Sequence, residues 1–184
     1  MNTEERIISA FKEMARSQGF NAVRMEELAA RAGITKKTIY SYFASKKDLI
    51  EKVVNTFITD IGFEVENIMS KTNLIETISS TAESVLKEGA FLFNAQSLRD
   101  LQIYYPDIWQ QFLKFRTQTI GSIVDVIYTR TKKKWVLEIN QRLLKEALIA
   151  IDNRFSSPEF AAEMGMPVEE LTLQMAKILI YPYL

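Results

Sequence analysis

The sequence predicts an all-α fold, and three features of it carry that prediction. Apolar residues recur at spacings of three and four along several long stretches, which is the periodicity of one buried helix face. Residues that favour a helix start, such as Asn, Ser, Thr and Pro, stand before most of these stretches, and glycine stands after several of them. No stretch shows the alternation of apolar and polar residues that indicates a half-buried strand. An apolar fraction of 47% is enough to form a sizeable core.

The chain begins with a predicted amphipathic helix. We expect it to start at Thr3, as its cap, and to run to Ser17, because Gly19 is the kind of residue that ends a helix. Its apolar stripe contains Ile7, Ala10, Phe11, Met14 and Ala15. This stripe would pack against the helices that follow.

Two short helices joined by a tight turn are predicted next. The first covers Met25 to Ala32, and Gly33 follows at the position where a left-handed residue ends a helix. Thr35 can cap the second helix, which covers Lys36 to Phe43, by accepting a backbone N–H. Polar and basic side chains gather on the outside and rim of this second helix: Lys36, Lys37, Thr38, Tyr40, Ser41 and Tyr42. This arrangement is typical of a helix that enters the major groove of DNA.

A long helix is expected to connect this region to the rest of the chain. Ser45 and Asp48 have the spacing of a capping box, and the apolar periodicity continues to about Met69. We therefore expect two domains, residues 1–47 and residues 48–184.

The second domain is predicted to consist of further helices. Asn73 and Glu76 predict the cap of a helix that contains Gly89 and extends to Phe93. The later elements are a short segment from Gln96 to Tyr104, a helix from Pro106 to Ile127, a loop at 132–134, a helix from Asn140 to Phe155, a short helix from Pro158 to Gly165 and a last helix from Pro167 to Tyr181.

Charge is divided unevenly between the two expected domains. Residues 1–47 carry nine Lys or Arg against five Asp or Glu, whereas residues 48–184 carry fourteen against eighteen. The formal charge of the whole chain is zero, but its first part is basic. A local excess of positive charge is what phosphate binding requires.

The residue types that the chain lacks exclude several kinds of chemistry. It contains no histidine and no cysteine, so nucleophilic pairs with histidine and zinc sites of the usual nitrogen or sulfur type are impossible. No glycine-rich phosphate loop is present, and we expect no catalytic residue, no metal and no cofactor. No apolar run is long enough to span a membrane, and the polar start has no signal core. We expect a cytoplasmic protein that is not an enzyme.

The stretch from residue 24 to residue 49 resembles the DNA-binding domain of the TetR family of bacterial transcriptional regulators. The matching positions are Leu28-Ala29, Ala32-Gly33-Ile34, Thr38-Ile39-Tyr40, Tyr42-Phe43 and Ser45-Lys46-Lys47-Asp48-Leu49. The resemblance implies a helix-turn-helix domain followed by a helical ligand-binding and dimerisation domain. Arg24 stands where many members carry a capping Thr, so Asn21 is the alternative cap, and Lys37 stands where many carry a small residue.

The resemblance also implies which side chains contact DNA. They are Arg24, Thr35, Lys36, Lys37, Thr38, Tyr40, Ser41, Tyr42 and Lys46. The lysines of the second short helix and Tyr40 would reach base edges or nearby phosphates, while hydroxyl groups hold phosphates. Arg24 would contact phosphate, and Lys46 would bind another phosphate near a helix N-terminus. The alternative is that the lysines form an ordinary solvated surface.

Aromatic residues crowd between Phe91 and Phe115, with polar side chains between them. Two interpretations are open: an ordinary helix core, or the ligand cavity that the resemblance implies. On the second interpretation the cavity binds a small hydrophobic or aromatic molecule, and Asn94 or Gln102 supplies an orienting hydrogen bond. The predicted lining is Phe91, Asn94, Gln102, Tyr104, Tyr105, Trp109 and Phe112.

A two-fold dimer is expected, because one recognition helix reads too few base pairs for specificity and a palindromic site solves this problem. The resemblance implies a four-helix interface made by residues 140–155 and 167–181 of each copy. The alternative is that these helices only cover the core of their own chain. We expect a ligand-responsive repressor that binds a double-stranded DNA operator as a homodimer. The alternatives are an activator, or an interaction or adaptor protein that keeps the fold without DNA binding.

Overall fold

The computed structural model of the protein describes residues 2–68 and 83–183. Within these ranges the structure is built from helices joined by turns and short connections, and they contain no strand. The predicted all-α fold is therefore confirmed. In the same ranges, no helix has the length and apolar character needed to cross a membrane.

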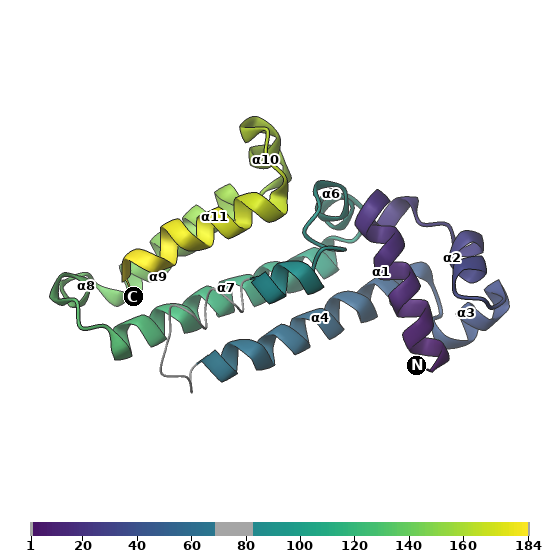
Figure 1. Ribbon diagram of the computed structural model, residues 1–184, viewed down its shortest axis with the longest axis horizontal. Coiled ribbons are helices and arrows are strands. Elements are labelled where there is room, and N and C mark those ends of the chain that lie inside the picture. The colour runs from purple at the N-terminus through teal and green to yellow at the C-terminus, as the bar shows by residue number, and fades with distance from the viewer. Residues whose placement is uncertain (1, 69–82, 184) are drawn as a thin grey trace.

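The described helices are labelled in Figure 1 in their order along the chain. In order they are α1 (Thr3–Ala22), α2 (Met25–Arg31), α3 (Lys36–Tyr42), α4 (Lys46–Ile68), α6 (Ala95–Tyr104), α7 (Pro106–Arg130), α8 (Lys134–Glu138), α9 (Gln141–Phe155), α10 (Pro158–Met164), α11 (Val168–Ile180) and the 3₁₀ helix η1 (Tyr181–Tyr183). Residues 83–88 are helical as well. We call α1, α2 and α3 the head, and the described chain from α4 onward the body.

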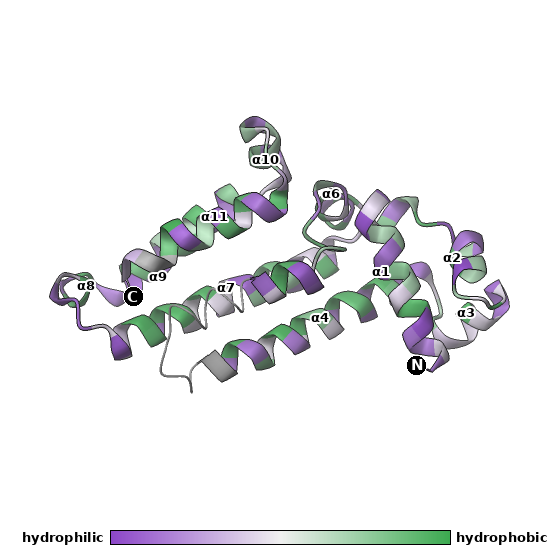
Figure 2. Cartoon of the chain, viewed as in Figure 1, coloured by the Kyte–Doolittle hydropathy of each residue, from purple (hydrophilic) through white to green (hydrophobic). Residues whose placement is uncertain are grey.

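Long helices lie beside one another in the body. In Figure 1, α4 and α7 run side by side, and α9 and α11 lie along the other side of α7. The hydrophobic residues of α4 lie mainly on its side toward α7 (Figure 2). Its buried side chains are Leu49, Ile50, Val53, Val54, Phe57 and Ile61. Because α4 starts against the head and continues through the body, it connects the two parts by one rigid element.

One apolar core extends from the head into the body. Phe11 and Phe20 of α1 stack with their ring centroids 5.9 Å apart, and Phe20 meets the edge of Phe91 at 6.2 Å. Phe91 in turn contacts Phe57 of α4, with the centroids 5.8 Å apart. Full burial of each such ring contributes about 1.5–3 kcal/mol. The aromatic contacts therefore hold α1, and with it the head, against the body.

The cap of α1 is one residue earlier than expected. The Asn2 side chain accepts the backbone N–H of Glu5 at 2.9 Å, and the Glu5 carboxylate accepts the backbone N–H of Asn2 at 2.9 Å. This is a reciprocal capping box. Thr3 is therefore the first helical residue and not the cap, because the Asn2–Glu5 pair has the spacing that closes both bonds.

α1 bends at Gly19, where it meets α6. We expected α1 to end at Ser17, but helical structure resumes after Gly19, whose φ of 79° and ψ of 173° are non-helical. Asp100 of α6, 1% exposed, accepts the backbone N–H of Asn21 at 2.7 Å. The Gln96 side chain donates to the same carboxylate at 2.9 Å. We call this contact of Gly19, Asn21, Gln96 and Asp100 the Asp100 junction.

The chain before α6 differs from the predicted helix. That helix was expected to extend to Phe93, but it ends at residue 88, and Gly89 lies in the turn that follows. A Cβ on Gly89 would lie 2.6 Å from the Phe93 ring and 2.7 Å from the carbonyl oxygen of Val85, so glycine permits this close turn. The predicted cap at Asn73 and Glu76 lies outside the described residues.

The starts and ends of the later predicted helices agree with the structure to within one residue, except that α7 continues to Arg130, three residues past Ile127. Pro106 begins α7, and the Asn140 side chain caps α9. The segment predicted from Gln96 is a regular helix, α6. The short helix α8 was not expected; it starts at Lys134, within the predicted loop. α11 begins at Val168, one residue after the expected start.

The substitution Gly19→Ala is expected to destabilise the protein. A φ of 79° is unfavourable for alanine, and the new Cβ would lie 2.5 Å from Cγ of Gln96 and 2.8 Å from Oδ2 of Asp100. We expect the free energy of unfolding to fall by about 1–3 kcal/mol, measured by denaturant titration.

Gly62→Ala is the matched control, because Gly62 is helical and no described neighbour lies within 4 Å of the added Cβ. This change should raise the free energy of unfolding by about 0.5–1 kcal/mol. Equal effects of the two substitutions would contradict the tight packing assigned to the Asp100 junction.

Candidate nucleic-acid interface and body cavity

α2 and α3 form a helix-turn-helix at the outer end of the head (Figure 1). Gly33 turns the chain between them with a φ of 65°, and Ile34 donates its backbone N–H to the Ala29 carbonyl at 3.0 Å. Leu28 of α2 and Ile39 of α3 are both 0% exposed. The apolar positions therefore hold the two helices together, as their spacing in the sequence predicted.

Hydroxyl side chains of α3 and of its cap form hydrogen bonds that add to the apolar packing of this helix. The Thr35 oxygen accepts the backbone N–H of Thr38 at 3.1 Å, so the predicted cap is confirmed. The two threonine hydroxyls lie 2.9 Å apart, and the Ser41 hydroxyl donates to the Thr38 carbonyl at 2.7 Å. α3 ends at Tyr42, one residue earlier than expected, and Phe43 is its C-cap. These bonds fix where the hydroxyl groups of α3 lie on the surface.

α3 presents a basic and aromatic face to solvent. Tyr40 and Tyr42 are 43% and 48% exposed. Lys36 forms an ion pair with Glu26 of α2, and its Nζ lies 5.9 Å from the centroid of the Tyr40 ring. Lys37 is exposed and has no hydrogen bond or ion pair with any residue that the structure describes. Lys37 therefore carries a positive charge that no described carboxylate neutralises.

The pair between Lys36 and Glu26 is charged but weakly held. Their hydrogen bond lowers the pKa of Glu26 and raises the pKa of Lys36. Both side chains are well exposed, and exposed ion pairs contribute little because water and salt screen them. Glu26 therefore holds the Lys36 side chain only weakly.

The start of α2 lacks a side-chain cap. Arg24 occupies the N-cap position and makes no capping bond, but it approaches Glu27 at 4.0 Å. The alternative cap, Asn21, is wrong, because this residue belongs to the end of α1 and its backbone N–H bonds Asp100. Arg24 is an exposed cation beside the helix-turn-helix.

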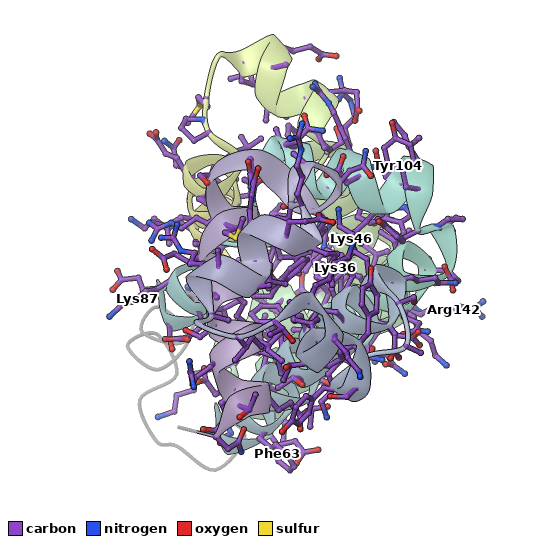
Figure 3. All side chains as sticks on the ribbon, turned by 90° about the vertical axis from the view of Figure 1, so that its right-hand side faces the viewer. Lys36, Lys46, Phe63, Lys87, Tyr104 and Arg142 are labelled. Atoms are coloured by element: carbon purple, nitrogen blue, oxygen red, sulfur yellow. The ribbon has the colours of Figure 1, made fainter. Side chains whose placement is uncertain are left out.

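Lys46 connects the first turn of α4 to the end of α1. Its Nζ donates to the backbone carbonyl of Asn21 at 2.7 Å, and partial burial lowers the pKa of Lys46. The predicted start of α4 is confirmed, since Ser45 accepts the backbone N–H of Asp48 at 3.1 Å. Figure 3 looks onto the head end of the molecule and labels Lys36 and Lys46. Lys46 thus fixes the start of α4 against the end of α1.

A cavity of about 180 Å³ lies in the body, between α4, α7, α9 and α11. Its apolar lining consists of Ile61, Val65, Val85, Leu86, Phe93, Phe112, Phe115, Ile120, Ile123, Leu173 and Ala176. Its polar lining consists of Arg116, Thr119, Asp152, Ser156 and Thr172. Its mostly apolar lining with a few polar groups resembles that of a small-molecule site.

Most of the residues predicted to line a ligand cavity lie elsewhere. Phe112 lines the cavity, whereas Phe91, Asn94, Gln102, Tyr104, Tyr105 and Trp109 do not. Phe91 is 2% exposed in the aromatic core, and Tyr104 is 55% exposed on the surface. The structure therefore does not bring the seven predicted residues together.

Asn94 caps α6, a role that the sequence analysis did not predict. Its side-chain oxygen accepts the backbone N–H of Ser97 at 2.8 Å and caps α6. Its side-chain nitrogen donates to the carbonyl of Phe91 at 3.0 Å and contacts the Ser97 hydroxyl at 3.0 Å. The amide is fully engaged in these local bonds, and it does not face the cavity.

Arg116 and Asp152 are cavity residues that the sequence interpretation missed. They form an ion pair between α7 and α9, with side chains only 13% and 20% exposed. A signal was present in the sequence, because Arg116 follows Phe112 and Phe115 on one apolar helix face. Its partner could not be located from the sequence, since Asp152 is 36 residues away.

The helices predicted to form a dimer expose apolar side chains. Leu143 of α9 is 64% exposed, and Ile178 of α11 is 62% exposed. On the other side of α9, Leu144 and Leu148 are 4% and 2% exposed and pack in the body. α9 thus covers the core of its own chain and also presents apolar groups outward. Among the described residues, no group of Asp and Glu side chains is arranged to hold a metal ion.

Comparisons with known proteins agree with this arrangement. The sequence profile described as "Bacterial regulatory proteins, tetR family" matches residues 7–53, from α1 to the first turns of α4. The uncharacterised HTH-type transcriptional regulator YvaF of Bacillus subtilis (strain 168) is 25% identical over 178 residues, which cover 96% of this chain and 93% of YvaF.

Solved structures show the same fold over nearly the whole chain. A transcriptional regulator from Cytophaga hutchinsonii superposes with a TM-score of 0.66 at 17% identity, covering 97% of this chain and 95% of that chain. The regulator FadR from Bacillus subtilis, solved in complex with stearoyl-CoA, superposes with a TM-score of 0.63 at 18% identity, covering 96% and 97%. The matching profile and the helix-turn-helix of the head identify residues 7–53 as a DNA-binding region of the TetR family of bacterial transcriptional regulators.

Proposed function

We propose that the protein is a cytoplasmic, ligand-responsive repressor that binds a palindromic operator as a homodimer. The observation that carries this proposal is the outward face of α3, where lysine, tyrosine and hydroxyl side chains are exposed on a helix held rigidly by α2. In this proposal residues 1–47 form the DNA-binding domain, and residues 48–184 form the ligand-binding and dimerisation domain.

The DNA contacts follow from the chemistry of the exposed groups. Lys36, Lys37 and Tyr40 reach base edges or nearby phosphates, and Arg24 contacts the flanking phosphate backbone. The remaining contacts to phosphate come from Thr35, Thr38, Ser41, Tyr42 and Lys46. Phosphate contacts position the helix, and contacts to base edges supply specificity. Lys46 exchanges the Asn21 carbonyl for a phosphate oxygen when DNA binds.

The dimer places two copies of α3 on successive major grooves. α9 and α11 form the interface, because both expose apolar side chains on the surface of the body, including Leu143 and Ile178. Pairing of these helices with their copies removes this apolar surface from water. The two-fold axis then matches a palindromic operator.

The body cavity is the site of the regulating ligand in this proposal. Support comes from its apolar lining and from the related fold of FadR, whose structure contains stearoyl-CoA. α4 lines the cavity with Ile61 and Val65, and its first turn contacts the head through Lys46. A ligand that binds better to a state with differently spaced heads weakens DNA binding by its differential affinity for the two states.

The first test is DNA binding with fragments from upstream of the gene itself. We expect one fragment to bind more tightly than random DNA at physiological salt in a gel shift. Lys37→Ala should weaken binding and reduce the slope of log affinity against log salt by about 1, since one phosphate contact is lost. Lys114→Ala is the control, because Lys114 is an exposed lysine of α7, away from the head.

Two results of this test would count against the proposal. If no fragment is preferred over random DNA, the repressor assignment fails and the alternative of an interaction or adaptor protein is favoured. If Lys37→Ala and Lys114→Ala have the same effect on the salt slope, the assigned DNA contact of Lys37 is wrong.

The second test concerns the dimer. Leu143→Glu combined with Ile178→Glu should convert the protein to a monomer in sedimentation experiments, because charged groups replace exposed apolar ones at the interface. Ile103→Glu is the control, since Ile103 is 66% exposed on α6, outside that interface. A double variant that still sediments as the wild-type dimer would show that the interface lies elsewhere.

A further inference from the structure

We infer that the body cavity selects an apolar molecule that carries one anionic group, a carboxylate, and that Arg116 receives this group. The inference rests on the proposed ligand-binding function of the body and specifies its chemistry. Its basis is the set of hydrogen bonds that polar side chains of the cavity wall form within the protein.

The cavity offers few polar groups to a ligand. The Thr172 hydroxyl donates to the Val168 carbonyl at 2.8 Å, and the Ser156 hydroxyl donates to Asp152 at 3.1 Å. These two hydroxyl protons are therefore in use within the protein. The larger apolar lining determines that most of the ligand is hydrocarbon or aromatic.

Both carboxylate oxygens of Asp152 already accept a hydrogen bond within the protein. Its Oδ2 accepts from Nη2 of Arg116, and its Oδ1 accepts from the Ser156 hydroxyl at 3.1 Å. Each oxygen can accept a second bond, but a ligand ammonium group at Asp152 would lie beside the Arg116 guanidinium, and the two positive charges would repel each other.

Arg116 retains donors that the protein does not use. A guanidinium has five N–H groups in a planar fork. Both hydrogen bonds that Arg116 makes to described residues come from Nη2. One goes to the Asp152 carboxylate, and the other goes to the Asp152 carbonyl oxygen at 3.3 Å. The group lies 5.8 Å from the centroid of the Phe112 ring, which also lines the cavity. Its remaining edge can bind a carboxylate without breaking the ion pair to Asp152.

The balance of charge makes Arg116 the determinant of selectivity. A carboxylate that leaves water for an apolar cavity loses its hydration, and charge-assisted bonds to Arg116 offset that loss. Asp152 opposes binding, because its negative charge neutralises Arg116 and repels a second carboxylate. Removing that charge should therefore strengthen the binding of an anion and weaken that of a cation. The substitution Asp152→Asn should therefore change the affinity for an anionic ligand and the affinity for a cationic ligand in opposite directions.

The experiment compares three ligands of equal chain length. Decanoate, decanol and decylamine are titrated below their micelle-forming concentrations into the full-length protein, and binding is measured by calorimetry in the absence of DNA. We expect the wild-type protein to bind decanoate roughly tenfold or more tightly than either of the others, the size of one hydrogen bond to a charged group.

Three variants complete the design. Arg116→Gln should lower decanoate affinity roughly tenfold and leave decanol affinity nearly unchanged. Asp152→Asn, which keeps an acceptor for Ser156, should raise decanoate affinity several-fold. Arg99→Gln is the control for a lost positive charge, because Arg99 is exposed on α6 and does not line the cavity. It should change neither affinity.

Several outcomes would overturn the inference. They are tighter binding of decylamine than of decanoate, binding of none of the three, or weaker binding of decanoate by Asp152→Asn. Should Arg116→Gln fail to fold, judged by circular dichroism, the sign of the Asp152→Asn effect decides the question. Because no DNA is present, failure of the repressor proposal would be seen in the gel shift and not here.

Discussion

The position of the head on the body depends on one buried carboxylate. Asp100 of α6 is buried and accepts the backbone N–H of Asn21 beyond the bend of α1, and a buried carboxylate without hydrogen bonds would be costly. The carbonyl of Asn21 in turn accepts from Lys46 at the start of α4. One residue of α1 therefore joins a body helix to the helix that leads out of the head. Gly19 makes this contact possible, because a side chain there would overlap Asp100.

α4 lines the cavity and also starts against the head, so it joins the proposed ligand site to the helix-turn-helix end of the molecule. Ile61 of α4 faces the cavity, Phe57 one turn earlier packs on Phe91, and Phe91 contacts Phe20 of α1. A change in the spacing of α4 and α7 at the cavity would displace these closely packed aromatic rings, which resist compression. The Arg116–Asp152 pair adds a second connection, from the cavity to α9.

The parts of the site that were predicted correctly depend on residues close together in the chain. Gly33, Thr35 and Ile39 each act within one turn or one helix crossing, so their roles could be inferred from spacing and residue type. The cavity could not be inferred in this way. Asn94 was predicted to orient a ligand, but its best partners are the backbone groups of its own turn. Local hydrogen bonding of Asn competes with any distant role, and sequence alone does not show which prevails.

The sequence by itself determined most of the helices, several of their caps, the basic face of α3 and the absence of histidine and cysteine chemistry. Each of these follows from periodicity, from capping or from composition, which act over short distances. Only the tertiary structure decided that Arg116 meets Asp152, that Asp100 meets Asn21, and that Phe112 lines a cavity whereas Phe91 lies in the core. These pairs join residues on different helices. Their contacts depend on how helices cross and pack, and an apolar stripe has the same pattern whether it faces a core or a cavity.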